Sequence, residues 1–180
     1  MTNDIQSVLL SEEVLQARIQ ELAAQISEEY AGKNPIFVGV LKGVVVFYAD
    51  MIRAFDAPCQ LDFMRISSYK GTQSTGNMVV RQDIAEDLQG RHVVILEDIL
   101  DTGRSLRFTR DYLRFKGAAS VKICTLLDKP EGRLPDVDIE ADYVGFTIPN
   151  AFVVGYGLDY NEKYRNLPYV GILKPEVYDK

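Results

Sequence analysis

The 180-residue sequence has few of the residues from which metal and redox sites are usually built. It contains two cysteines, Cys59 and Cys124, and a single histidine, His92. The cysteines lie too far apart for a local metal-binding motif, and one histidine makes a histidine-based metal site implausible. Cys124 lies in an apolar run, where a buried thiol is expected, and His92 is expected to be structural or exposed. The low cysteine count indicates a reducing, cytoplasmic setting.

Long apolar runs and an excess of basic residues are also missing. No run approaches the roughly 18 apolar residues that a membrane-spanning helix needs, and no basic patch followed by an apolar stretch marks a secretory signal at the start. The net charge of −6 argues against a nucleic-acid partner held by a broad basic surface. A small anionic substrate remains compatible, because a pocket can be locally positive on an acidic protein.

What is present is the composition of a folded domain. Hydrophobic residues make up 47% and charged residues 26%, close to the globular average. At roughly one domain per ~150 residues, one domain over residues 1–180 is expected. Helices are predicted at 11–30, 44–55 and 106–115, and strands at 36–41, 60–66, 93–96, 121–127, 143–148 and 169–173. A long polar loop is predicted at 67–77.

This alternation of strands and helices predicts an α/β fold with a mainly parallel, doubly wound sheet. Ligands of such sheets bind beyond the carboxyl ends of the strands. Two segments follow strands in this way and carry polar side chains. The first contains Lys42 and Gly43, and the second is residues 97–105.

Residues 97–105 combine two kinds of binding group. Glu97 and Asp98 offer adjacent carboxylates, which accept hydrogen bonds from the cis-diol of a sugar. The following residues lead into a helix, whose N-terminal N–H groups bind phosphate, and Gly103 permits the backbone angles of an anion-binding turn. A sugar phosphate would satisfy both halves. The structural alternative is a pair of solvated acids followed by Asp101 as a helix cap.

The segment resembles the phosphoribosyl-pyrophosphate signature of type I phosphoribosyltransferases. That signature is an apolar strand, two acids, two apolar residues, Asp-Thr-Gly, a variable residue and Ser or Thr. Over about residues 38–173 the chain is similar to bacterial hypoxanthine (6-oxopurine) phosphoribosyltransferases. The resemblance implies a doubly wound, mainly parallel sheet flanked by helices, with a small hood from the chain ends. It implies purine salvage, in which hypoxanthine or guanine reacts with phosphoribosyl pyrophosphate to give IMP or GMP and pyrophosphate.

The resemblance also assigns roles within residues 97–105. Asp101 matches the catalytic acid–base residue near N7 of the purine, and Glu97 and Asp98 match residues associated with the ribose diol and magnesium. One or two Mg²⁺ ions are implied because the departing pyrophosphate is highly charged, and Asp159 matches a contact to a second ion. The residues that match the loop for the 5′-phosphate are Asp101, Thr102, Gly103, Arg104 and Ser105, with Arg104 at the variable position.

Further residues match the pyrophosphate site. Lys42 and Gly43 belong to a turn that binds pyrophosphate in the family, often through a cis peptide bond. Ser68 and Tyr69 match a pair in the flexible lid, and Arg165 matches another pyrophosphate contact. The structural alternatives are an exposed turn lysine, a surface loop without a role, and a surface arginine.

The purine site is implied by two C-terminal segments. Lys129 matches a lysine that donates to O6 of the purine. Its ammonium has donors and no acceptor, so it favours a carbonyl over the 6-amino group of adenine. Phe152 matches a residue that stacks on the purine, Val153 one that reads its edge through main-chain atoms, and Asp159 one that also lies near the base. Phe152 as a core residue is the alternative.

Two other functions stay open. One is a phosphoribosyltransferase for xanthine or a pyrimidine. The other is a regulator that uses the sugar-phosphate site to sense a nucleotide, although such a sensor has no need of an acid–base residue like Asp101. Family likeness also suggests a homodimer or homotetramer, with no nucleic-acid or membrane partner.

Overall fold

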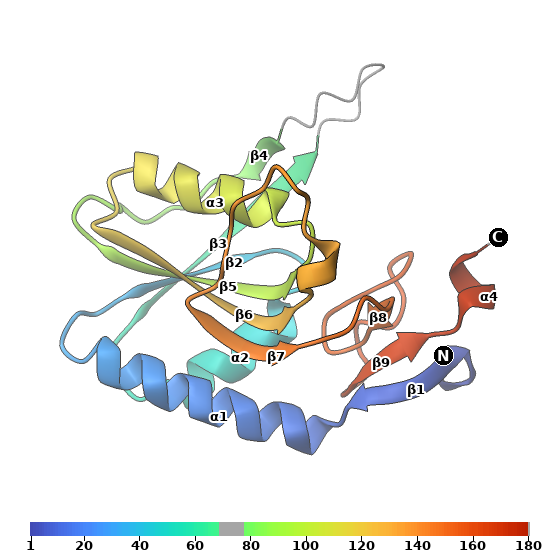
Figure 1. The fold of residues 1–180 in the computed structure, drawn as a ribbon. Coiled ribbons are helices and arrows are strands. Elements are labelled where there is room, and N and C mark those ends of the chain that lie inside the picture. Colours follow the sequence, from blue (N-terminus) through green and yellow to red (C-terminus); the bar gives the residue numbers. More distant parts are fainter. Residues whose placement is uncertain (69–77, 180) are drawn as a thin grey trace.

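The computed structural model describes residues 1–68 and 78–179, apart from the side chain of Ser68. A six-stranded sheet forms its centre, in the order β4-β3-β2-β5-β6-β7 (Figure 1). All neighbours are parallel except β4, which runs antiparallel to β3 at one edge. The strands are β2 (Ile36–Val40), β3 (Gln60–Ser68), β4 (Met78–Gln82), β5 (His92–Leu100), β6 (Ser120–Asp128) and β7 (Tyr143–Thr147).

Helices cover both faces of this sheet. Helices α1 (Glu12–Glu29) and α2 (Val45–Ala54) lie on one face, and α3 (Arg104–Phe115) lies on the other (Figure 1). Successive side chains of a strand point to opposite faces. On β5, Val94 and Leu96 therefore pack with the residues of α1 and α2, while Val93 and Ile95 pack with those of α3. The predicted doubly wound, mainly parallel sheet is confirmed.

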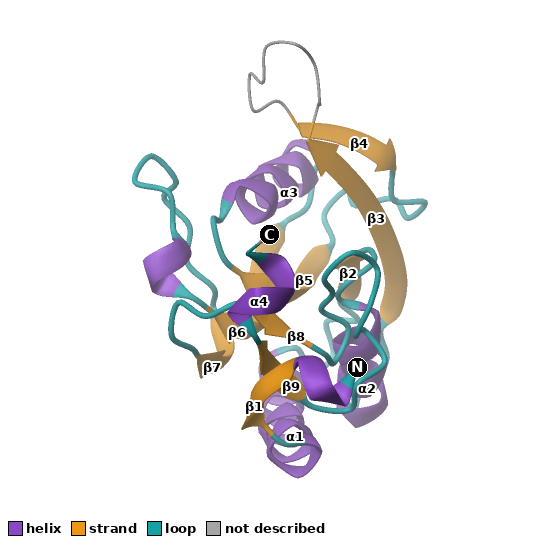
Figure 2. Cartoon of the chain, turned by 90° about the vertical axis from the view of Figure 1, so that its right-hand side faces the viewer, coloured by secondary structure: helices purple, strands orange, loops and turns teal. Residues whose placement is uncertain are grey.

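A second, three-stranded sheet forms the hood. Strand β1 (Ile5–Leu10) pairs antiparallel with β9 (Val170–Leu173), and β9 pairs with β8 (Val153–Val154). Figure 2 shows these strands together with the short helix α4 (Pro175–Tyr178). The hood touches the main sheet where β2 ends, because a Cβ built on Gly157 would lie 2.0 Å from the Gly43 carbonyl oxygen. The hood from both chain ends is also confirmed.

The predicted helices and long strands are confirmed to within a few residues, with one informative difference. Strand β5 continues through the acidic residues to Leu100 rather than ending at Leu96. Its neighbour β6 runs beside it over the same length, with Glu97 opposite Thr125 and Leu100 opposite Asp128. The pairing with β6 thus continues past the acidic residues, whereas the pairing of β5 with β2 ends at Leu96. Of the described helices, none has the length and apolar character to cross a membrane.

Six short elements were not predicted from the sequence pattern. These are the strands β1, β4 and β8 and the helix α4, together with the 3-10 turns η1 (Thr2–Asp4) and η2 (Pro130–Gly132). The ends of α1 and α3 follow common capping patterns. The Ser11 side chain accepts a hydrogen bond from Val14 N (3.4 Å) at the start of α1, and Gly117 has a φ of +94° just after α3.

Candidate active site

The acidic residues at the end of β5 lie against the turn that follows β2. A Cβ built on Gly43 would lie 1.8 Å from Asp98 Oδ2, so only glycine leaves room for this carboxylate. The turn begins at the Leu41-Lys42 peptide bond, which is cis. Because β2 and β5 are parallel neighbours, their carboxyl ends share one edge of the sheet. Two segments predicted to bind different parts of one ligand are therefore in contact.

Glu97 and Asp98 share an environment that disfavours two negative charges. Burial raises the pKa of the Glu97 carboxyl well above its ordinary 4.5, and the neighbouring Asp98 carboxylate raises it further. Burial likewise raises the pKa of Asp98, although Ile99 N donates to its Oδ1 at 2.9 Å. Glu97 Oε2 is buried and has no hydrogen-bond partner among the described residues. Such an atom calls for a donor or a cation supplied by a ligand.

Asp101 and Lys129 form an ion pair at the same edge. Lys129 Nζ lies 2.8 Å from Asp101 Oδ2, and the two side chains are 13% and 40% exposed. The topology explains the meeting, since β5 and β6 are adjacent and each of the two residues follows the end of one strand. Gly132 completes the arrangement, because a Cβ there would lie 1.8 Å from Asp101 Oδ1.

Arg133 supports this pair and was not predicted. Its Nη1 donates to the carbonyl oxygens of Leu100 (2.6 Å) and Asp101 (2.7 Å), and its Nη2 is paired with the Asp128 carboxylate. One guanidinium thus links the end of β5 to the end of β6. Arg133 lies close to Lys129 in the sequence, but it donates mainly to backbone carbonyl groups. Every residue has such a group, so the sequence does not indicate these contacts.

The predicted phosphate loop has the expected backbone shape. Gly103 has a φ of +81° and caps the N-terminus of α3, and a Cβ there would lie 2.5 Å from Ile139 Cγ2. The first-turn N–H groups of a helix have no acceptor within the helix, so they are available to an anion. Thr102 and Arg104 are exposed and Ser105 is half-buried. The exposure of Arg104 agrees with its variable position in the motif.

The predicted pyrophosphate ligands lie in a network of charges that includes one unexpected residue, Glu162. Lys42 Nζ lies 3.0 Å from Glu162 Oε2, and Arg165 Nη2 lies 3.3 Å from Glu162 Oε1. Arg165 also contacts Asp159 Oδ1 at 2.9 Å and donates to the Gly157 carbonyl oxygen at 2.8 Å. Lys42 and then Arg165 hold the pKa of Glu162 below its ordinary value. Glu162 lies three residues before Arg165, which is a local signal for their contact, but its contact with Lys42 spans 120 residues.

Phe152 belongs to an aromatic group of the hood. Its ring stacks on Tyr178, with centroids 4.8 Å apart and planes 20° apart, and meets the edge of Tyr160 at 5.5 Å. The Phe152 ring is 38% exposed, whereas Val153 is buried in β8. Phe152 is therefore not a fully buried core residue, and part of its surface is open to contact.

The predicted lid pair lies partly outside the described residues, and the predicted metal ligands are not brought together. Ser68 ends β3, and Tyr69 lies outside the described residues, so the predicted lid pair has no described contact. The proposed metal ligands Glu97, Asp98 and Asp159 do not form one cluster. Within residues 1–68 and 78–179, no group of three or more His, Cys, Asp or Glu side chains could hold a metal, and Asp159 faces Arg165 instead.

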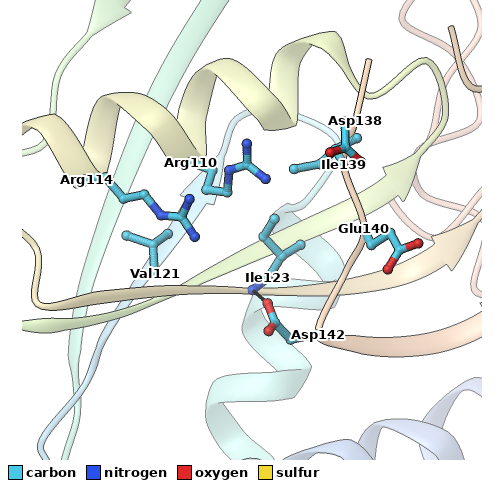
Figure 3. A pocket seen from close by; sticks show the side chains of 8 residues that line it. All are labelled: Arg110, Arg114, Val121, Ile123, Asp138, Ile139, Glu140 and Asp142. Atoms are coloured by element: carbon cyan, nitrogen blue, oxygen red, sulfur yellow. Dashed lines mark hydrogen bonds between the residues drawn. The ribbon is translucent and has the colours of Figure 1, made fainter. Parts of the chain in front are cut away.

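A separate cavity of about 290 Å³ lies between α3 and the segment before β7 (Figure 3). Arg110 and Arg114 project from α3 on one side, and acidic residues lie opposite. One of these acids, Asp142, accepts a hydrogen bond from Ile123 N at 2.8 Å. None of the predicted site residues lines this cavity. Glu97, Asp98, Asp101 and Lys129 lie instead at the carboxyl ends of β5 and β6.

Comparisons with known proteins agree with this geometry. Residues 8–161 match the model of the phosphoribosyl transferase domain family. The chain is 55% identical to a hypoxanthine-guanine phosphoribosyltransferase of Streptococcus pneumoniae, over 99% of this chain and 98% of the relative. A Streptococcus agalactiae enzyme of the same name is 52% identical over 100% and 99%. A crystal structure of a hypoxanthine phosphoribosyltransferase from Staphylococcus aureus superposes with a TM-score of 0.94 at 49% identity, covering 100% of this chain and 97% of that one.

Proposed function

The chain belongs to the phosphoribosyltransferase family, and from this premise we propose that it is a purine-salvage enzyme. It transfers ribose 5-phosphate from phosphoribosyl pyrophosphate to N9 of hypoxanthine or guanine and releases pyrophosphate, with IMP or GMP as the other product. Relatives that carry the name hypoxanthine-guanine phosphoribosyltransferase match nearly the whole chain, which supports this acceptor over a pyrimidine.

The observation that carries the proposal is the ion pair of Asp101 and Lys129, 2.8 Å apart. Guanine presents N7 and O6 as neighbouring acceptors on one edge, whereas adenine presents N7 beside an amino donor. In the N7–H tautomer of a 6-oxopurine, N7 is a donor beside the O6 acceptor and N9 keeps its lone pair. An ammonium next to a carboxylate matches that edge, with Lys129 donating to O6 and Asp101 accepting from N7–H. An amino group in place of O6 would leave the ammonium without an acceptor.

The acid–base step falls to Asp101. As N9 bonds to C1 of the ribose, the purine loses a proton at N7, and a carboxylate within hydrogen-bond reach accepts it. Such assistance is worth roughly 10²–10⁴ in rate. The Asp101 side chain is 40% exposed, so substrate has access to it, and Arg133 holds the Asp101 carbonyl in place.

The sugar phosphate occupies the rest of the edge. The ribose cis-diol donates to Glu97 and Asp98, which gives the buried Glu97 Oε2 a partner. The 5′-phosphate lies at the N-terminus of α3, against the turn at Gly103. The pyrophosphate extends toward Lys42 and Arg165, which the contacts of Glu162 bring together.

The residues fit a magnesium ion that is held mainly by the substrate. Two adjacent carboxylates, Glu97 and Asp98, are hard oxygen ligands of the kind that Mg²⁺ prefers, and a Mg²⁺ ion retains several other oxygen ligands. The ion supplies charge neutralisation for the departing pyrophosphate. Three expectations stay predictions. They are a second metal contact through Asp159, assembly as a homodimer or homotetramer, and a cytoplasmic location.

An assay of nucleotide formation tests the proposal. The purified protein is supplied with phosphoribosyl pyrophosphate, Mg²⁺ and one base at a time, chosen from hypoxanthine, guanine, xanthine, adenine and uracil. We expect IMP and GMP to form efficiently, with little product from adenine or uracil. Equal activity with adenine would remove the role given to Lys129, and a protein inactive with every base would overturn the proposed function.

A further inference from the structure

Glu162 occupies the position in which two cations converge. Its carboxylate contacts Lys42 Nζ at 3.0 Å through one oxygen and Arg165 Nη2 at 3.3 Å through the other. A carboxylate that bridges two cations in this way offers them what a bridging phosphate would offer, two negative oxygen atoms on one centre. Lys42 is 50% exposed and Glu162 is 64% exposed, so the contact is open to exchange with a ligand.

The two cations depend on Glu162 to different degrees. Arg165 has two other acceptors, the Gly157 carbonyl oxygen and the Asp159 carboxylate, at 2.8 and 2.9 Å. Its guanidinium therefore keeps its position without Glu162. For Lys42, Glu162 is the one ion-pair partner within residues 1–68 and 78–179. Removal of the Glu162 charge would release the lysine while leaving the arginine in place.

Glu162 is nevertheless held toward the cations by its own backbone. The Glu162 N–H donates to Asp159 Oδ2 at 2.8 Å, and both Asn161 and Glu162 have positive φ angles, +51° and +60°. Non-glycine residues seldom adopt such angles, and they persist where the surrounding structure fixes them. The turn thus places this carboxylate within contact of Lys42 and Arg165 while it stays accessible to solvent.

We propose that Glu162 is a built-in competitor for the diphosphate subsite. Its carboxylate is paired with Lys42 and Arg165, and the pyrophosphate group of the donor must displace it in order to bind. When pyrophosphate leaves, the carboxylate pairs with the two cations again. The inference rests on the proposed function and deepens it, because it names a residue that sets donor affinity and product release. Exposed ion pairs are weak because solvent screens them, so a pyrophosphate with several charges displaces Glu162.

The same exchange predicts which substrate is affected. Lys42 and Arg165 are proposed to contact the diphosphate, whereas the purine lies at Asp101 and Lys129. A change at Glu162 should therefore alter the binding of phosphoribosyl pyrophosphate and pyrophosphate but leave the KM for hypoxanthine unchanged. A general loss of stability would alter both.

The test is the titration of inorganic pyrophosphate, in the presence of Mg²⁺, into the wild-type protein and Glu162→Gln by calorimetry. A matched control is Glu21→Gln, because Glu21 is 65% exposed and pairs with Arg18 on α1. Glu162→Gln should bind pyrophosphate about three- to tenfold more tightly, as expected for removal of one partly screened charge from an anion site. In steady-state assays its KM for phosphoribosyl pyrophosphate should fall by a similar factor, while Glu21→Gln behaves as wild type.

Other outcomes separate this inference from the proposed function. A wild-type protein that makes no IMP overturns the function itself. A wild-type protein that makes IMP, together with a Glu162→Gln variant that binds pyrophosphate equally or more weakly, overturns only the competitor role. An equal gain in affinity in Glu21→Gln would show a general charge effect and would also overturn it.

Discussion

Lys129 Nζ lies 2.8 Å from Asp101 Oδ2, so the group proposed to bind O6 and the group proposed to serve N7 neutralise each other across the end of the sheet. Their separation resembles that of two neighbouring atoms on a purine edge. The Arg133 guanidinium donates to the Asp101 carbonyl oxygen and so fixes the backbone at the pair. The absence of a side chain at Gly132 leaves room for the Asp101 carboxylate. If these proposed roles hold, purine specificity depends on how β5 and β6 end side by side.

Replacement of Asp101 by Asn should reduce turnover much more than donor binding. The amide keeps the shape of the carboxylate but cannot accept the N7 proton, so kcat should fall by roughly 10²–10⁴, with the KM for phosphoribosyl pyrophosphate changed by less than about threefold. Steady-state kinetics measures both. Asp111→Asn, at an exposed site on α3, serves as control. Unchanged turnover in Asp101→Asn would remove Asp101 from the mechanism.

Replacement of Lys129 by Met should weaken selection for 6-oxopurines. Methionine has a similar length but no donor, and loss of a charged hydrogen bond of about 1.5–3 kcal/mol corresponds to a rise of roughly 10- to 150-fold in the KM for hypoxanthine and guanine. The ratio of hypoxanthine to adenine activity should fall. Lys116→Met, which breaks the remote pair with Asp83, should leave this ratio unchanged. A preserved ratio in Lys129→Met would place base selection elsewhere.

Replacement of Gly132 by Ala should displace Asp101 without changing it. The added Cβ would lie 1.8 Å from Asp101 Oδ1 and 2.9 Å from Lys129 Cε, so the carboxylate must rotate away. A displacement of a catalytic group by about 1 Å can lower the rate ~10²-fold. We therefore expect kcat to fall by about that factor. The melting temperature should change little, since side-chain ends can move. A drop in stability with normal kcat in the folded fraction would contradict this.

Removal of divalent metal should stop the reaction and leave the fold intact. We expect a chelator to abolish nucleotide formation and added Mg²⁺ to restore it, because the ion neutralises charge on the departing pyrophosphate. In the described parts of the chain no three-ligand metal cluster exists, so thermal unfolding followed by circular dichroism should be unaltered. Full activity in the chelator, or a lower melting temperature, would each contradict the expectation.

Replacement of Glu29 by Gln should destabilise the protein only where Glu29 is ionised. Lys122 and then Tyr143 hold the pKa of Glu29 below its ordinary 4.5. A carboxyl with a lowered folded-state pKa contributes its full stabilisation above 4.5 and loses it as the pH falls through the folded value. Since the pair is about one-third exposed, a loss of roughly 0.3–1 kcal/mol is expected at pH 7.

Urea denaturation of Glu29→Gln at several pH values measures this loss. The difference from wild type should be present at pH 7 and vanish below the folded pKa of Glu29. The neighbouring Glu28→Gln, at an exposed position of α1, should show no such dependence. A constant difference at all pH values would point to packing rather than charge.

Local patterns allowed much of the fold and half of the site to be predicted. The loop at Gly103 depends on consecutive residues, and its φ of +81° follows from a glycine placed before a helix. Strand β1 was missed because its middle residues are exposed and its partner β9 comes from the other end of the chain. Glu162 was missed because its contact with Lys42 spans 120 residues, and Arg133 because its acceptors are backbone carbonyls.

The pairing of β1 with β9 has a consequence for the order in which the protein acquires its abilities during translation. Strands β2, β3 and β5 and the start of α3 follow β1 out of the ribosome well before β9, and neighbouring parallel strands can associate as they emerge. Strand β1 must wait with an unpaired edge until β9 has been made. Phe152 and Arg165 also emerge late. A nascent chain should therefore be able to hold a sugar phosphate before it can enclose a base or a pyrophosphate.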